Sequence, residues 1–182
     1  GIWEGALSSK TLWEISRDVK RLHNQDRGYR VSEFQLDYPA VRNAMMSAVQ
    51  SRADQLTAQL EAFLSKTDLF RYENAHGKLL SPHSVELTFP DGSQETVESE
   101  YILLATGSSP RELAHIPIDN VNTFTSDGIH YLNDFPESLV ILGAGVIGCE
   151  FATIFANFGK TKVFIIEKGD RIIGFEDPDV SE

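Results

Sequence analysis

A glycine-rich turn between two short apolar runs, in SLVILGAGVIGCEFATIFANFGKTKVFIIEKGD, most constrains the fold of this chain. A strand over 139–142 is predicted to run into the turn, and a helix to open there and end at Gly159 before a second strand. The turn glycines are Gly143, Gly145 and Gly148. The first permits a sharp bend, the second lets backbone amides approach a pyrophosphate, and the third lets the helix lie close to its strands. With the free N–H groups of the helix N-terminus, they predict a βαβ dinucleotide-binding site.

The second predicted strand, KVFIIE, ends in Glu167, where a βαβ dinucleotide site places the acid that binds the ribose hydroxyls. The charge of this acid also repels a 2′-phosphate, so NAD(H) is favoured over NADP(H). Lys168 and Arg171 soften this preference without reversing it. The alternative interpretation is a glycine-rich turn in some other α/β protein, but the strand, glycines, helix and terminal acid together favour the dinucleotide site.

Glu150 follows the glycines in the first turn of the predicted helix, where the helix dipole favours an acid. A carboxylate so close to a dinucleotide phosphate is repulsive unless a cation pairs with it. We therefore expect a lysine partner for Glu150, which the local pattern does not identify.

The residues before the glycine turn predict two helices, a hairpin and a further strand. The first helix covers 8–23, with an N-cap at Ser8 or Ser9, and the second covers about 39–66. Alternation on both sides of PDGS predicts a hairpin over 83–98, and YILLATGSSP predicts a buried strand that ends in a small-residue turn. In the helix after the glycine turn, the side chains expected to pack on the sheet are Ile147, Phe151, Ile154, Phe155 and Phe158.

The composition argues against several classes of protein. The formal net charge of −11 disfavours nucleic-acid binding, because 16 Lys and Arg residues are scattered among 27 acids. No apolar run reaches the roughly 18 residues that a membrane span needs. Cys149 is the single cysteine, so no internal disulfide is possible, and no Cys/His cluster has metal-ligand spacing. We therefore expect an acidic, cytoplasmic protein with no metal site.

Several motifs together resemble the central part of the flavin-dependent pyridine nucleotide-disulfide oxidoreductases, in a dihydrolipoamide dehydrogenase-like form. ALSSKTLWE resembles the helix start that follows the family's redox-cysteine loop, and YILLATGSSP resembles the ATG turn that closes its FAD domain. SDGIHYLNDFPESLVILGAGVIGCEFA resembles the start of its NAD domain. The resemblance implies an α/β fold, in which residues 1–110 are the C-terminal part of an FAD domain, with helices plus a β-meander. Residues 111–182 are then the first βαβ unit of a Rossmann-like NAD domain.

The resemblance also implies roles for residues outside the glycine turn. Thr106 and Gly107 match the ATG turn, which in the family packs against FAD near its phosphates. Lys10 matches the lysine of the family's PSK motif, which lies beside the flavin and pairs with the glutamate after the NAD-domain glycines, here Glu150. Such a pair would favour the anionic reduced flavin and orient the nicotinamide for hydride transfer. Lys10 and Glu150 are thus the predicted catalytic residues, and FAD and NAD the predicted cofactors.

The family's redox disulfide has no match in this sequence. Counted back without gaps from Lys10, the second cysteine of its C-x4-C pattern falls on Ala6 and the first on Gly1, or on Trp3 if the loop is two residues shorter. A thiolate relay to a disulfide substrate is then not available. We expect the flavin to pass electrons directly to a small-molecule acceptor, which is a quinone, a metal complex or a second nicotinamide.

Family members also begin with an FAD-binding βαβ unit and end with a dimerisation domain, neither of which is matched here. We therefore expect a fragment of a longer homodimeric protein that, alone, is inactive and binds FAD weakly or not at all. The intact protein is expected to transfer hydride between NAD(H) and FAD. One alternative is dihydrolipoamide dehydrogenase activity proper, with cysteines supplied in another way. The other alternative is a catalytically inactive paralogue that serves as a binding scaffold.

Overall fold

The chain forms two compact units in its computed structural model, which describes residues 5–24, 28, 30–67, 69–111 and 113–181. The first unit comprises Gly1–Asp54 and Pro110–Glu182, and the second comprises Gln55–Ser109. One boundary between the units, after Ser109, falls beside the expected domain boundary after residue 110. The division into FAD and NAD domains stays a prediction.

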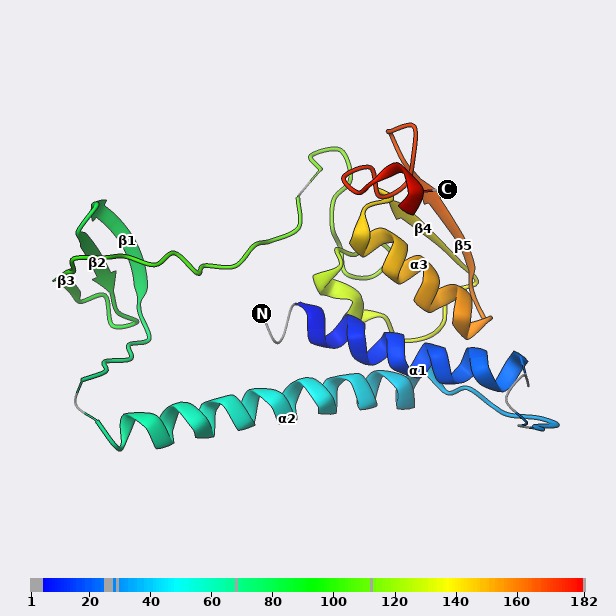
Figure 1. Ribbon diagram of the computed structural model, residues 1–182, viewed down its shortest axis with the longest axis horizontal. Coiled ribbons are helices and arrows are strands. Elements are labelled where there is room, and N and C mark those ends of the chain that lie inside the picture. Colours follow the sequence, from blue (N-terminus) through cyan, green and yellow to red (C-terminus); the bar gives the residue numbers. More distant parts are fainter. Residues whose placement is uncertain (1–4, 25–27, 29, 68, 112, 182) are drawn as a thin grey trace. The chain divides into compact units, whose positions relative to one another are not determined.

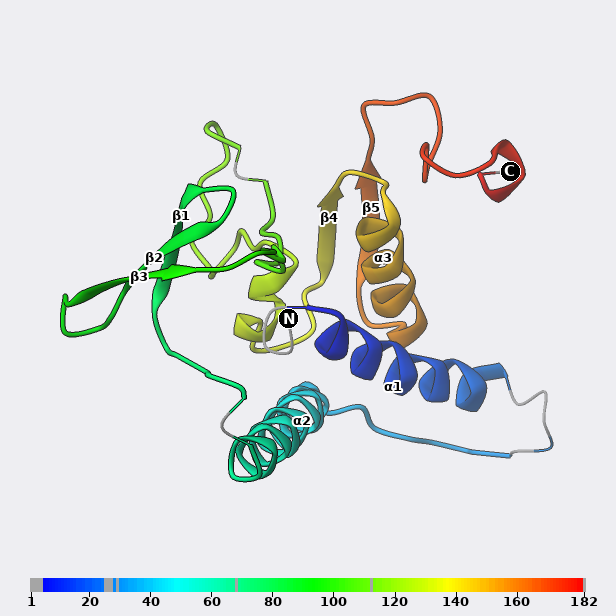
Figure 2. The same cartoon turned by 60° about the vertical axis from the view of Figure 1, so that its left-hand side comes forward.

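A βαβ arrangement dominates the C-terminal half of the first unit. Strands β4 (Ser138–Leu142) and β5 (Lys162–Ile166) are parallel neighbours, and α3 (Val146–Phe158) connects them across one face of the sheet (Figure 2). Gly159 ends α3 with φ +68, a left-handed conformation that favours glycine. The predicted order of strand, glycine turn, helix and strand is confirmed, as is the α/β class.

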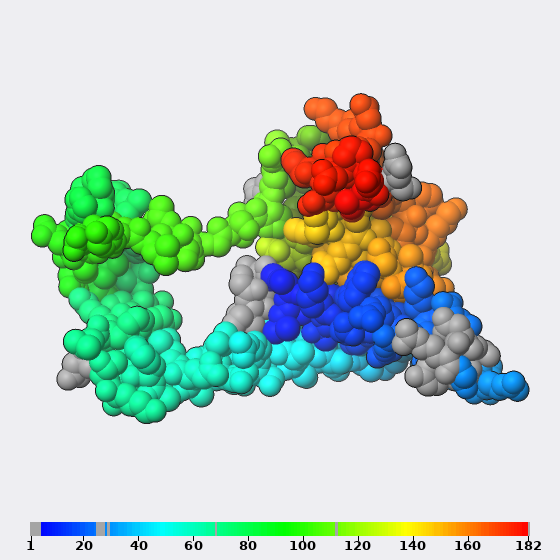
Figure 3. Space-filling model, viewed as in Figure 1, coloured from blue at the N-terminus to red at the C-terminus, as the bar shows by residue number. Residues whose placement is uncertain are grey.

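Helix α1 (Ala6–Asn24) packs along α3, and the two helices lie side by side in the ribbon and on the surface (Figures 1 and 3). The first turns of α2 (Tyr38–Leu64) complete the core of this unit. The buried apolar side chains are Leu12, Val19, Tyr38, Val41, Met45, Ile129, Phe151, Ile154, Phe155 and Phe158. Burial of these aromatic and aliphatic groups is the main source of stability for the layer that carries α3.

Two short 3-10 helices lie in the segments around the βαβ arrangement. The first, η1 (Asp127–Tyr131), places Ile129 in the core, and Arg42 Nε of α2 donates a 2.7 Å hydrogen bond to the His130 carbonyl. The second, η2 (Pro178–Val180), follows β5. No helix in the described ranges is long and apolar enough to cross a membrane.

The second unit contains a small antiparallel meander. Its strands β1 (His76–Ser81), β2 (Ser84–Thr88) and β3 (Gln94–Glu98) pair in sequence order. Gly92 has φ +83 in the turn between β2 and β3, which suits a glycine. The hairpin predicted over 83–98 is therefore confirmed.

Two of the predicted strands are less buried than expected. Residues 101–105 form no strand, and Leu103 is 90% exposed, because in the described part of the chain no strand lies beside this segment. Strand β4 forms as predicted, but Val140 is 53% exposed and alternates with half-buried neighbours. Helix α3 covers only one face of the β4–β5 pair, which leaves the other face open.

Two local predictions on the helices are wrong. Helix α1 begins at Ala6, before both predicted caps, and the Ser8 hydroxyl donates to the Gly5 carbonyl at 2.9 Å instead of accepting from an N–H group. Ile147 is 57% exposed, because it lies in the first turn of α3 at the carboxyl edge of the sheet. The other four side chains predicted for the face of α3 are buried.

Candidate functional site

The three glycines between β4 and α3 have different surroundings. Gly143 has φ +101, a conformation that other residues rarely adopt. A Cβ atom at Gly148 would lie 2.1 Å from the Gly143 carbonyl oxygen, so only glycine lets the helix lie so close to the turn. A Cβ atom at Gly145 would meet nothing within 4 Å. This open space at the start of α3, where N–H groups lack helical partners, fits the close approach of a pyrophosphate.

Glu167 lies at the end of β5 and contacts the glycine turn directly. Its Oε2 atom accepts a 2.6 Å hydrogen bond from the Ala144 N–H, and its Oε1 atom accepts a 2.7 Å bond from the Gly169 N–H. These backbone donors, Ala144 first, hold the pKa of Glu167 below its usual range. The predicted ribose-binding acid is thus ionised at neutral pH and is brought together with the glycine turn.

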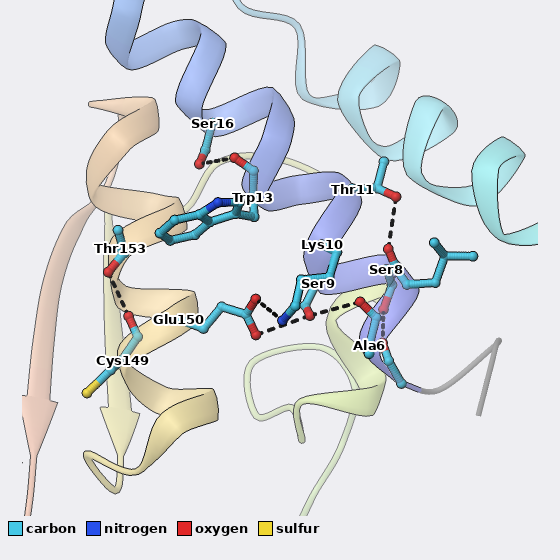
Figure 4. Close-up of polar contacts among 12 residues, drawn as sticks. Ala6, Ser8, Ser9, Lys10, Thr11, Trp13, Ser16, Cys149, Glu150 and Thr153 are labelled. Atoms are coloured by element: carbon cyan, nitrogen blue, oxygen red, sulfur yellow. Dashed lines mark hydrogen bonds and ion pairs between the residues drawn. The ribbon is translucent and has the colours of Figure 1, made fainter. Parts of the chain in front are cut away.

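Lys10 and Glu150 form an ion pair between α1 and α3. The Nζ atom of Lys10 lies 2.5 Å from Oε1 of Glu150 (Figure 4). The side chain of Glu150 is 15% exposed, whereas that of Lys10 is 60% exposed. The structure therefore supplies the lysine partner that Glu150 was expected to need. Glu150 lies beyond the first turn of α3, which begins at Val146 and contains no acid, so the predicted first-turn position is wrong.

Two contacts that support the site, one to Glu150 and one to the glycine turn, were not predicted from the sequence. Ser9, which is buried, donates a 3.2 Å hydrogen bond to Oε2 of Glu150 (Figure 4). Ile173 donates its backbone N–H to the Ala144 carbonyl at 2.7 Å. A contact between Ser9 and Glu150 could have been expected from the neighbouring Lys10, since the serine lies on the buried side of the same helical turn. A backbone contact such as that of Ile173 leaves no signal in residue type.

Thr106 and Gly107 belong to the second unit and lie on an exposed, extended segment after β3. Gly107 has φ +76, so the ATG turn adopts a backbone conformation that favours glycine. The structure does not group these two residues with the glycine turn in one unit. Their assignment to FAD stays a prediction.

The positions matched to the redox cysteines carry no thiol in the sequence. Gly1 and Trp3 lie outside the described residues, and Ala6 is the first residue of α1. Cys149 lies on α3, partly buried, and its Sγ atom donates to the Ala144 carbonyl at 3.5 Å. Among the residues that the structure describes, no group of three or more His, Cys, Asp or Glu could hold a metal ion.

Comparison with known proteins finds a matching family and several relatives. A family model described as pyridine nucleotide-disulphide oxidoreductase matches residues 3–182. Dihydrolipoyl dehydrogenase from Bacillus subtilis is 33% identical over 182 residues, which covers 98% of this chain and 38% of that protein. Soluble pyridine nucleotide transhydrogenase from Mycobacterium tuberculosis is 41% identical over 109 residues, which covers 59% of this chain and 23% of that protein.

The fold of a solved structure is also similar. LpdA from Mycobacterium tuberculosis superposes with a TM-score of 0.82 at 22% identity, over 99% of this chain and 39% of that chain. At this identity, the likeness shows the fold alone. The chain spans a little over a third of the length of the dihydrolipoyl dehydrogenases that it matches from end to end.

Proposed function

The chain belongs to the pyridine nucleotide-disulphide oxidoreductase family, and on that premise we propose that the whole protein is an FAD-dependent oxidoreductase that transfers hydride between NAD(H) and FAD. The family uses FAD and a pyridine nucleotide. In this proposal, Gly143, Gly145, Gly148 and Glu167 bind NAD(H), whereas Thr106 and Gly107 contribute to the FAD site. The isolated chain carries only part of these sites, since it spans a little over a third of its relatives.

The ion pair of Lys10 and Glu150 is the observation that carries the proposal. Glu150 lies on α3 two residues after Gly148 and its carboxylate is largely buried, whereas the ammonium of Lys10 on α1 is exposed. A pair of neutral side chains would hold two helices together at a lower desolvation cost. A charge pair at this position instead serves a function, because it places a cation next to the proposed site for an anionic dinucleotide.

Each residue then has a definite task. FAD and NADH supply the hydride acceptor and donor when they are bound. Glu167 accepts from the ribose hydroxyls with its remaining lone pairs and repels a 2′-phosphate. The Lys10 ammonium stabilises negative charge that develops during hydride transfer. Glu150 holds that ammonium in place, and Ser9 holds the carboxylate of Glu150.

The proposed electron acceptor is not a disulfide. Ala6, together with Gly1 or Trp3, stands where the family's cysteines are expected, so a thiolate relay has no residues to run through. The candidates are a quinone, a metal complex or a second nicotinamide. Similarity to the soluble pyridine nucleotide transhydrogenases favours the nicotinamide.

Stopped-flow reduction of the intact flavoprotein by NADH tests this function. Flavin bleaching is expected on mixing, followed by reoxidation with a quinone, a dye or an oxidised nicotinamide analogue. Lipoamide is expected to give no turnover. Rapid turnover with lipoamide would instead identify dihydrolipoamide dehydrogenase proper, and the absence of flavin reduction by NADH would identify a scaffold paralogue.

Two further expectations belong to the same proposal. The intact protein is proposed to be a cytoplasmic homodimer, by analogy with the family. Sedimentation equilibrium of the intact protein measures the oligomeric state, and a single species of monomer mass would contradict the dimer. Cell fractionation with an antibody to the chain measures the location.

A further inference from the structure

The peptide groups of Ala144 are both held by the segment that follows β5. Its N–H donates to Oε2 of Glu167 at 2.6 Å, and its carbonyl accepts from the Ile173 N–H at 2.7 Å. Ala144 is 1% exposed and lies between Gly143 and Gly145. The segment after β5 therefore fixes Ala144, at the centre of the glycine turn, by hydrogen bonds to both its N–H and its carbonyl.

Ile173 adopts an unusual backbone conformation to make this contact. Its φ is +49, which is an outlier for a β-branched residue. Such strain persists only where surrounding contacts over-determine it, and it gathers at functional sites. Here, Arg171 supplies those contacts, because its Nη2 atom donates to the carbonyls of Gly174 and Glu176 at 3.0 and 2.8 Å. The Glu176 N–H also donates to the Ile173 carbonyl at 3.0 Å.

The hydrogen bonds to Ala144 limit which N–H groups of the glycine turn can bind a phosphate. The Ala144 N–H is taken by Glu167, so the donors left for a phosphate begin at Gly145 and continue into α3. The orientation of the Ala144 peptide sets the direction in which the chain enters that first turn. A turn already fixed in this way binds a dinucleotide without the cost of ordering a flexible loop.

We infer that Ile173 is a positioning residue for the dinucleotide, and that its backbone N–H, not its side chain, fixes the glycine turn for binding. This inference rests on the proposed NAD(H) site. It assigns no contact between Ile173 and the dinucleotide, since the residue acts through Ala144. A strained isoleucine outside the glycine fingerprint is thereby given a reason for its conformation.

Three substitutions at Ile173 in the intact flavoprotein separate the backbone from the side chain. Ile173→Pro removes the N–H and fixes φ near −65°, whereas Ile173→Gly and Ile173→Asn keep the N–H and tolerate a positive φ. Isothermal titration with NAD⁺ is expected to show a Kd raised about tenfold or more for the proline variant. The glycine and asparagine variants are expected to stay within about twofold of the wild type.

Amide hydrogen exchange of the peptide that covers 143–148, measured without nucleotide, gives a second readout. Exchange is expected to be faster in Ile173→Pro than in the wild type and unchanged in the other two variants. A folded proline variant with wild-type exchange and wild-type Kd overturns the inference. If the proline variant does not fold, Arg171→Gln takes its place, with faster exchange and a higher Kd expected, and wild-type values for both again overturn the inference.

Failure of the proposed function is distinguishable from failure of this inference. A wild type that does not bind NAD⁺ removes the site, and the inference with it. If the wild type binds NAD⁺ but NADH does not reduce its flavin, only the proposed redox function is overturned. The ratio of Kd values between Ile173→Pro and Ile173→Asn still decides the role of Ile173 in that case.

Discussion

The buried hydroxyl of Ser16 on α1 accepts a 3.3 Å hydrogen bond from the side-chain amide of Asn157 on α3. Seven residues earlier on each helix, Ser9 donates to Glu150. The two contacts form a ladder with a seven-residue repeat, so α1 and α3 run in the same direction in a fixed register. Because Lys10 follows Ser9, this register also sets the position of the ammonium beside Glu150.

Ser16→Ala is expected to lower the free energy of unfolding by about 1 kcal/mol, because it removes the buried acceptor of the Asn157 amide. Urea unfolding of wild type and variant measures this difference. Ser65→Ala is the matched control, since the hydroxyl of that exposed serine, just after α2, donates to the local Ala62 carbonyl at 3.0 Å. Its unfolding free energy is expected to stay within about 0.5 kcal/mol of the wild type. Equal losses for the two serines would contradict a role for the α1–α3 ladder.

Alanine at two of the turn glycines is expected to have different effects, on stability at Gly148 and on NAD⁺ affinity at Gly145. Gly148→Ala places a Cβ atom 2.1 Å from the Gly143 carbonyl oxygen and is expected to cost about 1–3 kcal/mol of stability through overpacking. Gly145→Ala meets no atom within 4 Å, and Gly145 has φ −73, so stability is expected to be unchanged. Its methyl group fills the space proposed for the pyrophosphate, so NAD⁺ affinity is expected to fall about tenfold or more. Thermal unfolding and NAD⁺ titration of both variants separate the two roles, and normal NAD⁺ binding by Gly145→Ala would contradict the proposed site.

The elements with strong local patterns could be predicted from the sequence, whereas the conformation of residues 101–105, which depends on neighbouring strands, could not. The positions of the glycines predict the glycine turn, and the alternation of apolar and polar residues around PDGS predicts the hairpin. Residues 101–105 have the apolar composition of a buried strand, but a strand needs partners, and the described residues provide none beside it. Composition alone does not reveal whether such partners are present.

The candidate site was predictable in its charges and glycines but not in its supports. Glu150 required a cation on electrostatic grounds, and resemblance supplied Lys10, which the structure places 2.5 Å away. Ser9 and Ile173 act through a hydroxyl and a backbone N–H, whose partners depend on helix register and loop path. Helix register and loop path depend on tertiary contacts between distant segments, which local patterns of residue type do not reveal.

The Lys10–Glu150 pair is expected to matter for chemistry more than for folding. Lys10→Met in the intact flavoprotein is expected to slow flavin reduction by NADH about tenfold or more, because the cation that stabilises developing charge is lost. The unfolding free energy is expected to fall by no more than about 1–2 kcal/mol, since the Lys10 side chain is 60% exposed and Ser9 still donates to the Glu150 carboxylate.

Glu150→Gln and the double variant complete a cycle with Lys10→Met. Stopped-flow absorbance measures flavin reduction in all four proteins, and the double variant is expected to be little slower than the slower single variant, because the two residues act as a unit. Arg17→Met is a control, since Arg17 pairs with Glu14 elsewhere on α1. Effects that multiply independently would contradict a functional pair.

The lowered pKa of Glu167 predicts how the glycine turn responds to acid. The folded state favours the ionised carboxylate, so its stabilising effect is complete above the ordinary value of 4.5 and is lost as the pH falls through the lower folded pKa. NAD⁺ affinity is therefore expected to be independent of this group between about pH 7 and 5 and to weaken below that range. Glu167→Gln keeps only one acceptor oxygen and is expected to bind NAD⁺ more weakly at neutral pH, without the acidic decline. Titration calorimetry from neutral to acidic pH measures both curves.

Asp119→Asn is the matched control for this acidic transition. Three backbone N–H groups, those of Val121, Thr123 and Asn122, lower the pKa of Asp119 in the same way, but on a loop that has no hydrogen bond to the glycine turn among the described residues. The control is expected to alter the pH dependence of stability while NAD⁺ affinity follows the wild-type curve. If Asp119→Asn removes the acidic decline in NAD⁺ affinity, or if Glu167→Gln retains it, the decline does not arise from the Glu167 carboxylate.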